Sequence, residues 1–102
     1  MEINKAISNQ NVIFTLSGRL DTLTSPQLED EINNTSFEDT ENVILNMHDL
    51  EYISSSGLRV ILSLYKALKN QNSKLKIINV NSGIMELFSM TGLADYMDIE
   101  TA

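Results

Sequence analysis

Hydrophobic and polar residues alternate in two neighbouring segments at the start of the chain. The alternation occupies residues 3–7 and resumes at Val12, Phe14 and Leu16. A period of two is typical of a strand with one buried face. The polar run at 9–11, Asn-Gln-Asn, is typical of a turn. The start of the chain therefore predicts two strands joined in a hairpin.

The pattern changes to helical spacing most clearly between Ser55 and about Asn70. Apolar residues recur there every three or four positions, and polar residues occupy the opposite stripe. The apolar positions are Leu58, Ile61, Leu62, Tyr65 and Leu68. Lys66 and Lys69 fall in the last turns, where cations complement the partial negative charge of the exposed carbonyls. We expect this segment to be the best-defined helix of the chain.

Two shorter helices are indicated by the residues at their ends. Ser25-Pro26 is a good helix opening, because Pro fits the first helical position and Ser is a favoured cap. Ser82 is the expected cap of the second helix, which we expect to stop at Gly92.

Three further apolar runs predict strands. Val43-Ile44-Leu45 is unbroken and β-branched in part, which is typical of a central strand covered on both faces. Leu75 to Val80 predicts another strand, and a last short strand is expected around Met97 to Ile99. Because strands alternate with helices, the predicted fold class is α/β, with a mixed, mostly parallel sheet of four to five strands. The first hairpin would form an antiparallel edge of this sheet.

Length and composition limit the classes of function. A chain of 102 residues predicts a single domain over 1–102. The absence of Cys removes disulfides, thiolate catalysis and Cys-ligated metals, and with one His we expect no metal and no cofactor. With 14 acidic residues against 7 scattered basic ones, the chain lacks the basic face that a nucleic acid partner requires.

Hydropathy bears on location. Residues 1–6 lack the basic start and apolar run of a secretion signal, and no stretch approaches about 18 apolar residues. We therefore expect a cytoplasmic protein that does not insert into a membrane.

Three consecutive hydroxyls, Ser54-Ser55-Ser56, precede Gly57 where the best-defined helix begins. Helix starts leave unpaired N–H donors, and one Ser is explained as a cap worth about 0.5–2 kcal/mol. The same donors attract anions, and a phosphate ester on one of these hydroxyls would fit there. Capping and a modified or ligand-binding site both remain as interpretations.

The serine run is part of a longer motif of fixed spacing. It comprises Asp-Leu, a variable residue, an aromatic residue, an apolar residue, the serines and Gly-Leu, at Asp49, Leu50, Tyr52, Ile53, Ser55, Ser56, Gly57 and Leu58. This motif resembles the signature of the STAS domains, and among them of the bacterial anti-sigma factor antagonists, or anti-anti-sigma factors. The likeness extends over the whole chain through Gly18-Arg19-Leu20-Asp21, Val60-Ile61-Leu62, Tyr65-Lys66, Leu87-Phe88 and Thr91-Gly92-Leu93. The resemblance implies the STAS fold.

The resemblance also implies a small protein switched by phosphorylation. In the family, an anti-sigma factor that is also a serine kinase modifies the first Ser of the Ser-Ser-Gly run, which is Ser55 here. The unphosphorylated protein binds the anti-sigma factor and frees the sigma factor, and a serine phosphatase restores this form. Asp21, Ser54, Ser56 and Gly57 are then expected to surround the phosphorylation site.

One position departs from the family pattern, because the Asp expected before the acceptor is Ser54 here. Either the kinase tolerates Ser, with a carboxylate supplied by Asp21 or Asp49, or the switch is weakened or lost in this branch. A loop Asp also bonds its own backbone, so Asp21 has a structural interpretation beside the functional one. The serine run leaves Ser56 as a second candidate acceptor after Ser55.

The expected partner surface is the exposed edge of the 55–70 helix, including Arg59 and Ser63. Met90, close to the predicted helix stop, is a further candidate contact. The alternative function is a non-switched STAS scaffold subunit of a stress-sensing assembly or of a lipid or anion transport assembly.

We expect no catalytic residues. His48-Asp49 could form a hydrolytic set with a serine, but adjacent strand residues point to opposite faces, and the chain has no Gly-x-Ser-x-Gly elbow. The protein is therefore expected to act by binding rather than as an enzyme.

Overall fold

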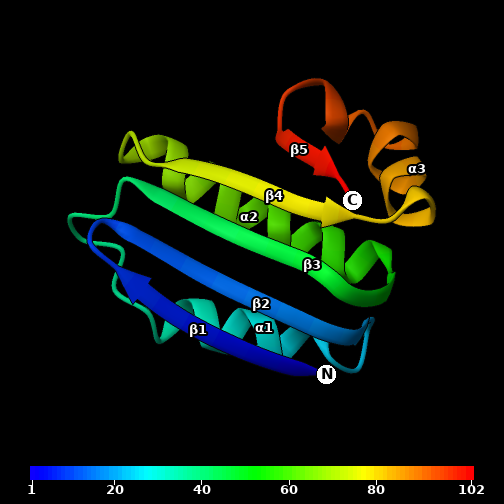
Figure 1. Ribbon diagram of the computed structural model, residues 1–102, viewed down its shortest axis with the longest axis horizontal. Helices are drawn as coiled ribbons and strands as arrows, with labels where there is room; N and C mark the ends of the chain where they lie inside the picture. The colour runs from blue at the N-terminus through cyan, green and yellow to red at the C-terminus, as the bar shows by residue number, and fades with distance from the viewer.

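A five-stranded sheet organises the molecule, and the computed structural model describes all of residues 1–102 (Figure 1). The strands lie in chain order: β1 Glu2–Ser8, β2 Asn11–Leu20, β3 Asn42–Ile53, β4 Lys74–Val80 and β5 Asp98–Thr101. The helices are α1 Ser25–Asn33, α2 Ser55–Asn70 and α3 Ser82–Met90, followed by a short 3-10 turn, η1, at Leu93–Asp95. The long helix has the predicted bounds.

The pairing of the strands confirms the predicted fold class. β1 and β2 form an antiparallel hairpin, with Ile3 opposite Leu16 and Ile7 opposite Val12. The remaining neighbours, β2 to β5, pair in parallel. Parallel strands need crossover connections, and α1, α2 and α3 occupy the three crossovers. The ends of β2 and β3, which lead into α1 and α2, therefore lie at the same edge of the sheet.

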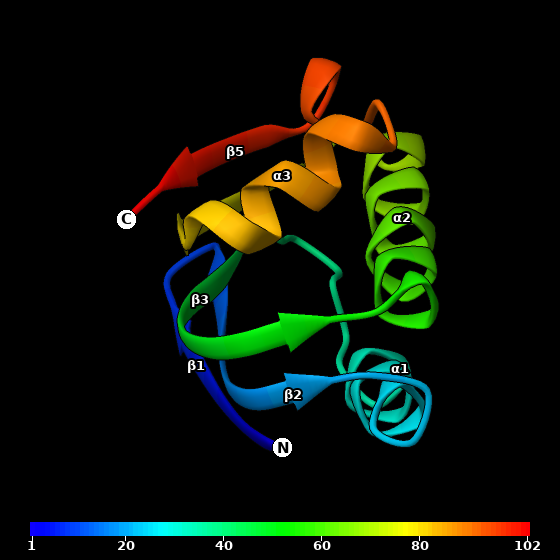
Figure 2. The same cartoon turned by 90° about the vertical axis from the view of Figure 1, so that its right-hand side faces the viewer.

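The helices α1 and α2 cover one face of the sheet and leave the other face open (Figures 1 and 2). Phe14 and Leu45, on the covered face, are 0% exposed, whereas Ile13 and Ile44, on the other face, are half-buried. The prediction that the run at 43–45 is covered on both faces is therefore wrong for Ile44. An apolar run without alternation does not distinguish a fully covered strand from one whose open face is partly apolar.

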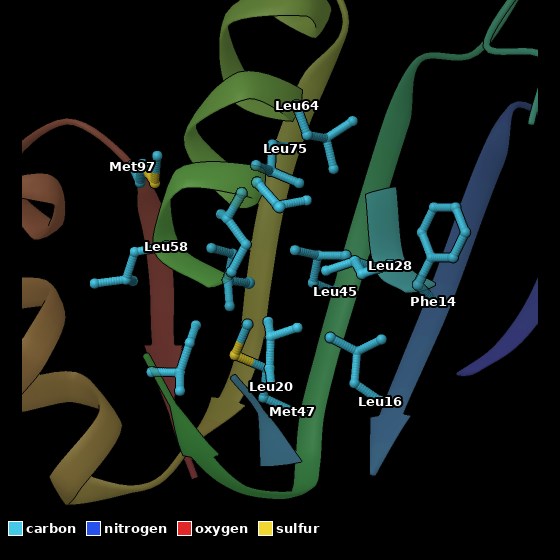
Figure 3. Packing of buried hydrophobic residues seen from close by; sticks show 14 of the residues in the cluster. Phe14, Leu16, Leu20, Leu28, Leu45, Met47, Leu58, Leu64, Leu75 and Met97 are labelled. Atoms are coloured by element: carbon cyan, nitrogen blue, oxygen red, sulfur yellow. The ribbon is translucent and has the colours of Figure 1, made fainter. Parts of the chain in front are cut away.

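The core lies between the sheet and the helices as one cluster of 22 buried apolar residues (Figure 3). Phe14 and Leu16 from β2, Leu28 from α1 and Leu64 from α2 are each no more than 3% exposed. The buried positions of α2 include three of the predicted apolar ones, Leu58, Ile61 and Leu68. The amphipathic pattern of this helix thus gives its packing onto the sheet.

Two helix starts are shifted by one residue from the prediction. Thr24 rather than Ser25 stands at the N-cap of α1, and the Ser25 hydroxyl instead donates to the Asp21 carbonyl. Asn81 rather than Ser82 caps α3, where its side chain accepts a backbone N–H at 2.9 Å. Asn, Ser and Thr are all favoured caps, so the sequence does not choose between such neighbours.

The end of the chain follows the prediction with one small difference. Gly92 has a left-handed φ of 79° just after α3, as its role in stopping the helix requires. The last strand begins at Asp98 rather than Met97. Met97 is 6% exposed and belongs to the core (Figure 3).

Candidate functional site

Ser54 caps α2 and ties its start to the end of β2. Its hydroxyl accepts the Gly57 N–H at 3.4 Å, and its own N–H donates to the Leu20 carbonyl at 2.9 Å. Ser and Asp are both favoured caps, because each offers an oxygen to the free N–H groups of the first turn. Ser54, in place of the Asp of the family pattern, therefore keeps the cap and removes a negative charge.

The next two serines are the first residues of the helix, and their surroundings differ. Ser56 is half-buried, and its hydroxyl oxygen lies 3.3 Å from that of Thr22. Ser55 is exposed, and its hydroxyl has no hydrogen-bond partner within the chain. Among the three serines, only Ser55 therefore has an unengaged hydroxyl.

Gly57 allows α2 to begin tightly against the ends of β2 and β3. A Cβ atom at this position would lie 2.7 Å from Leu20 Cγ and 3.0 Å from Ile53 Cγ1. Leu20 and Ile53 are 0% and 1% exposed, so neither moves aside without disturbing the packed core. The glycine is therefore required for space, and it sets how closely the serines approach the edge of the sheet.

The loop between β2 and α1 lies beside the start of α2, as the resemblance implied. Thr22 makes the contact with Ser56 across 34 positions of sequence. Leu23, the next residue, is 89% exposed, more than any other large hydrophobic residue of the chain. Sequence reasoning missed both residues, because a contact between such distant segments leaves no local pattern.

Asp21 organises this loop through its side chain. Its Oδ1 accepts the N–H groups of Leu23 at 3.0 Å and Thr24 at 3.2 Å, and its Oδ2 lies 3.8 Å from Arg19 Nε. Loss of hydration raises the pKa of this carboxyl, but the hydrogen bonds from Thr24 and Leu23 and the charge of Arg19 hold the pKa of Asp21 below its ordinary value of 3.8. The carboxylate makes no hydrogen bond to the serines at 54–56, so the structural interpretation accounts for its contacts.

A surface groove, here called the α1–α2 groove, runs between these two helices. Its part nearest the serines has a volume of about 250 Å³ and is mostly polar, with Thr22, Ser56 and Arg59 in its walls. The next part, of about 480 Å³, is more apolar, and Glu29 and Ser63 line both parts. The two residues expected on the partner surface, Arg59 and Ser63, thus share a groove with one of the serines.

Met90 is separate from this groove. It is the last residue of α3, is 75% exposed and lines neither part of the groove. The structure does not join Met90 to the serines, and its role as a partner contact stays a prediction.

The side chains of His48 and Asp49 meet, so the expectation that they point to opposite faces is wrong. His48 Nδ1 lies 2.9 Å from Asp49 Oδ1, and both side chains are exposed. The register between β2 and β3 shifts between Thr15 and Ser17, which pairs with Asp49. Such an irregularity disturbs the alternation of side chains. Neither member of the pair hydrogen-bonds to a serine.

Two general features of the structure bear on the predicted site. No three His, Cys, Asp or Glu side chains gather as ligands of a metal ion. No helix combines the length and the apolar character that crossing a membrane would take.

Comparisons with known proteins show what this architecture is similar to. A model of the STAS domain matches residues 2–102. The structure superposes with a TM-score of 0.87 on an anti-sigma factor antagonist from Mycobacterium paratuberculosis, at 17% identity, covering 99% of this chain and 86% of that one. It also superposes with a TM-score of 0.76 on the phosphorylated form of the Bacillus cell fate determinant SpoIIAA, at 22% identity, covering 98% of this chain and 92% of that one.

The sheet order and the connection from β3 into α2 through the serine run define the protein as a STAS domain. Over 101 residues the sequence is 30% identical to the anti-sigma-B factor antagonist of Staphylococcus aureus, covering 97% of this chain and 94% of that protein. The chain belongs to the STAS domain family, in the branch of the anti-sigma factor antagonists.

Replacing Gly57 by Ala is expected to destabilise the protein. The added Cβ overlaps Leu20 and Ile53, and overpacking of a core typically costs about 1–3 kcal/mol, which exceeds the gain of about 0.5–1 kcal/mol from Ala in a helix. Urea unfolding followed by circular dichroism measures the difference.

Gly83→Ala is the matched control for this change. A Cβ there meets only Asn81 Oδ1 at an ordinary contact distance of 3.5 Å, so this variant should be as stable as the parent or more so. Equal stability changes in the two variants would show that the start of α2 is not tightly packed.

Asp21 is expected to make the stability of the protein depend on acid pH. Because the pKa of its carboxyl is lower in the folded chain than its ordinary value of 3.8, the stabilisation is fully present above that value and is lost as the pH falls through the folded pKa. Carboxyl ¹³C NMR should show Asp21 titrating at a lower pH than an ordinary Asp, and the urea midpoint should fall as the pH is lowered below 3.8.

Asp21→Asn should make the urea midpoint depend less on acid pH, because Asn keeps an oxygen for the loop N–H groups and loses the charge. Asp30→Asn, which removes an exposed acid of α1 whose side chain makes no hydrogen bond or ion pair, should retain the parent's profile. If both variants behave alike, the loop does not hold the charged form of Asp21.

Proposed function

We propose that this anti-sigma factor antagonist is a switch controlled by phosphorylation of Ser55. In its unphosphorylated form it binds an anti-sigma factor that is also a serine kinase, and so releases a sigma factor. The kinase transfers the γ-phosphoryl group of ATP to Ser55 Oγ: the Oγ–P bond forms, the bond to ADP breaks, and the hydroxyl proton leaves to the kinase. A serine phosphatase hydrolyses the ester and restores binding.

The observation that carries this proposal is the difference among the three serines. Ser54 and Ser56 have their hydroxyls in contact with Gly57 N–H and Thr22 respectively, whereas the hydroxyl of Ser55 is exposed and unengaged. Ser55 is also the position that matches the acceptor of the family motif. A phosphoryl group can be added there without breaking the cap of α2.

The physical effect of the phosphate supports release of the partner. Phosphorylation adds about −1.5 to −2 charges to a chain whose net charge is already −7. A partner contact built around a neutral hydroxyl would lose packing and enclose an unpaired charge, at a cost of about 2–5 kcal/mol. About 2.7 kcal/mol already lowers affinity a hundredfold, which suffices to release a partner present at a similar concentration.

The surface proposed to bind the partner comprises the α1–α2 groove beside Arg59 and Ser63, and the adjacent Leu23. Leu23 is 89% exposed and follows Thr22, which lines the groove, so its side chain is suited to act as an apolar anchor. Met90 remains a proposed contact on a separate helix.

The same proposal includes how and where the chain acts. Residues 1–102 would work as one STAS domain in the cytoplasm, by binding rather than by catalysis. The only His of the chain, His48, has its Nδ1 within hydrogen-bond distance of Asp49 on the same strand, β3, rather than of a serine hydroxyl.

The phosphorylation step is tested with the anti-sigma factor kinases of the source organism, purified and incubated with ATP. Mass spectrometry is expected to find one phosphate, on Ser55, in the parent and in Ser82→Ala, which removes an exposed serine at the start of α3, and none in Ser55→Ala. Ser55→Asp should bind the anti-sigma factor at least tenfold more weakly than Ser55→Ala. Absence of phosphate, with equal binding of the two variants, would instead support the non-switched scaffold.

Replacing Leu23 by Ser is expected to weaken binding of the anti-sigma factor at least tenfold without loss of stability. Burial of a Leu side chain in an interface contributes about 1.5–3 kcal/mol, whereas an exposed side chain contributes little to folding. Isothermal titration calorimetry and urea unfolding measure the two effects.

Ile7→Ser is the control for Leu23→Ser, because Ile7 is 65% exposed and pairs with Val12 at the start of β2, the opposite end from Leu23. This variant should bind as the parent does. A similar loss of affinity in both variants would remove Leu23 from the proposed partner surface.

A further inference from the structure

Arg59 is a cation without a partner in a strongly acidic chain. Of the seven basic residues, four are engaged. Lys5, Arg19 and Lys76 form ion pairs with carboxylates, and Lys69 lies 5.8 Å from the centre of the Tyr65 ring. Arg59 makes no ion pair or hydrogen bond, although the chain carries twice as many acidic as basic residues. Its guanidinium group is therefore available to a ligand.

The position of Arg59 on α2 places it next to the reactive serine. It follows Ser55 by four residues and Ser56 by three, and side chains so spaced lie on one face of a helix with Cβ atoms about 5–6 Å apart. Lys66 and Lys74, the other unpaired cations, are more remote. Lys66 stands eleven residues after Ser55, which is roughly 16 Å along the helix axis.

Among the charged groups around the start of α2, only Arg59 is both close to Ser55 and free of other contacts. Arg19 pairs with Asp21 at 3.8 Å and its guanidinium carbon lies 4.3 Å above the Tyr52 ring, so its approach to Ser55 would require two contacts to break. Glu29 faces Arg59 across the α1–α2 groove without forming an ion pair. Glu29 is thus a weak competitor for Arg59.

We propose that Arg59 is an intramolecular latch for a phosphate on Ser55, and that closing the latch withdraws Arg59 from the partner-binding surface. This inference rests on the proposed phosphorylation of Ser55. A guanidinium group binds phosphate oxygens through two parallel N–H···O bonds, which is stronger and more directional than binding by an ammonium. Phosphorylation of Ser55 would then change the partner-binding surface in two ways. It would add a dianion, and it would draw the Arg59 side chain out of the α1–α2 groove toward the phosphate.

The latch is tested with phosphoserine incorporated genetically at position 55, so that no kinase is needed. The second pKa of a phosphoserine is ordinarily about 6, and an adjacent arginine stabilises the dianion and lowers it. In ³¹P NMR titrations, the phosphate of Arg59→Gln should titrate about half a pH unit higher than that of the parent. That shift is about a threefold change in proton affinity, or ~0.7 kcal/mol.

Lys66→Gln is the matched control, because it removes the same charge from the same helix beyond reach of Ser55. It should leave the pKa of the phosphate as in the parent. Arg59→Lys should raise that pKa less than Arg59→Gln does, and 1 M salt should reduce the difference between the parent and Arg59→Gln. Glu29→Gln should leave the pKa of the phosphate as in the parent or lower it further. Equal titrations in the parent and Arg59→Gln, or equal shifts in Arg59→Gln and Lys66→Gln, would overturn the latch.

The latch and the proposed function fail in different ways. If the kinases never modify Ser55, the proposed switch is ruled out. The NMR measurement on the phosphoserine protein would still show whether Arg59 binds the phosphate. Conversely, a phosphorylated Ser55 with an unshifted titration would keep the switch and remove the latch.

Discussion

The start of α2 lies where it does because Gly57 has no Cβ to collide with Leu20 and Ile53. This close approach determines how the start of α2 sits against the ends of β2 and β3. It lets the Ser54 N–H reach the carbonyl at the end of β2, and it brings the first turn of α2 against the loop that carries Thr22. Since α2 contributes more buried residues to the core than α1 or α3, the site stands on a helix that is firmly packed against the sheet.

A consequence of this geometry is that three chemically identical residues have three different surroundings. The Ser54 hydroxyl is a cap, whose loss typically costs about 0.5–2 kcal/mol, and Ser56 is in contact with the neighbouring loop. A phosphate on either one would interrupt a contact that holds the two segments together. Ser55 alone could gain a phosphate with the contacts around it intact, so the backbone rather than the residue type distinguishes the proposed acceptor. Of the two interpretations of the serine run, capping accounts for Ser54 and leaves the Ser55 hydroxyl unengaged, as the proposed modification requires.

The features that the sequence predicted are those set by local patterns. The periodicity of α2, with a Ser-Gly start, gave its bounds at Ser55 and Asn70 without error, and the alternation of strands and helices gave the parallel sheet. The features it missed depend on contacts between distant segments: Thr22 meets Ser56, and a shift in register brings His48 and Asp49 side chains together. Helix caps were misplaced by one residue at Ser25 and Ser82, because each has a neighbour equally suited to capping.

The distribution of charge explains how a neutral Ser54 is compatible with a phosphorylation switch. The Asp21 carboxylate is held by its own loop and by Arg19, and Asp49 is bonded to His48. With Ser54 uncharged, no carboxylate hydrogen-bonds to the serine run, and an unpaired arginine stands one turn away. Repulsion between a phosphate on Ser55 and the chain's own carboxylates would therefore be weak. In the proposed switch, the phosphate would therefore act mainly across the interface, on a partner fitted to a neutral hydroxyl. Arg59 would stabilise the phosphorylated form after the partner has dissociated.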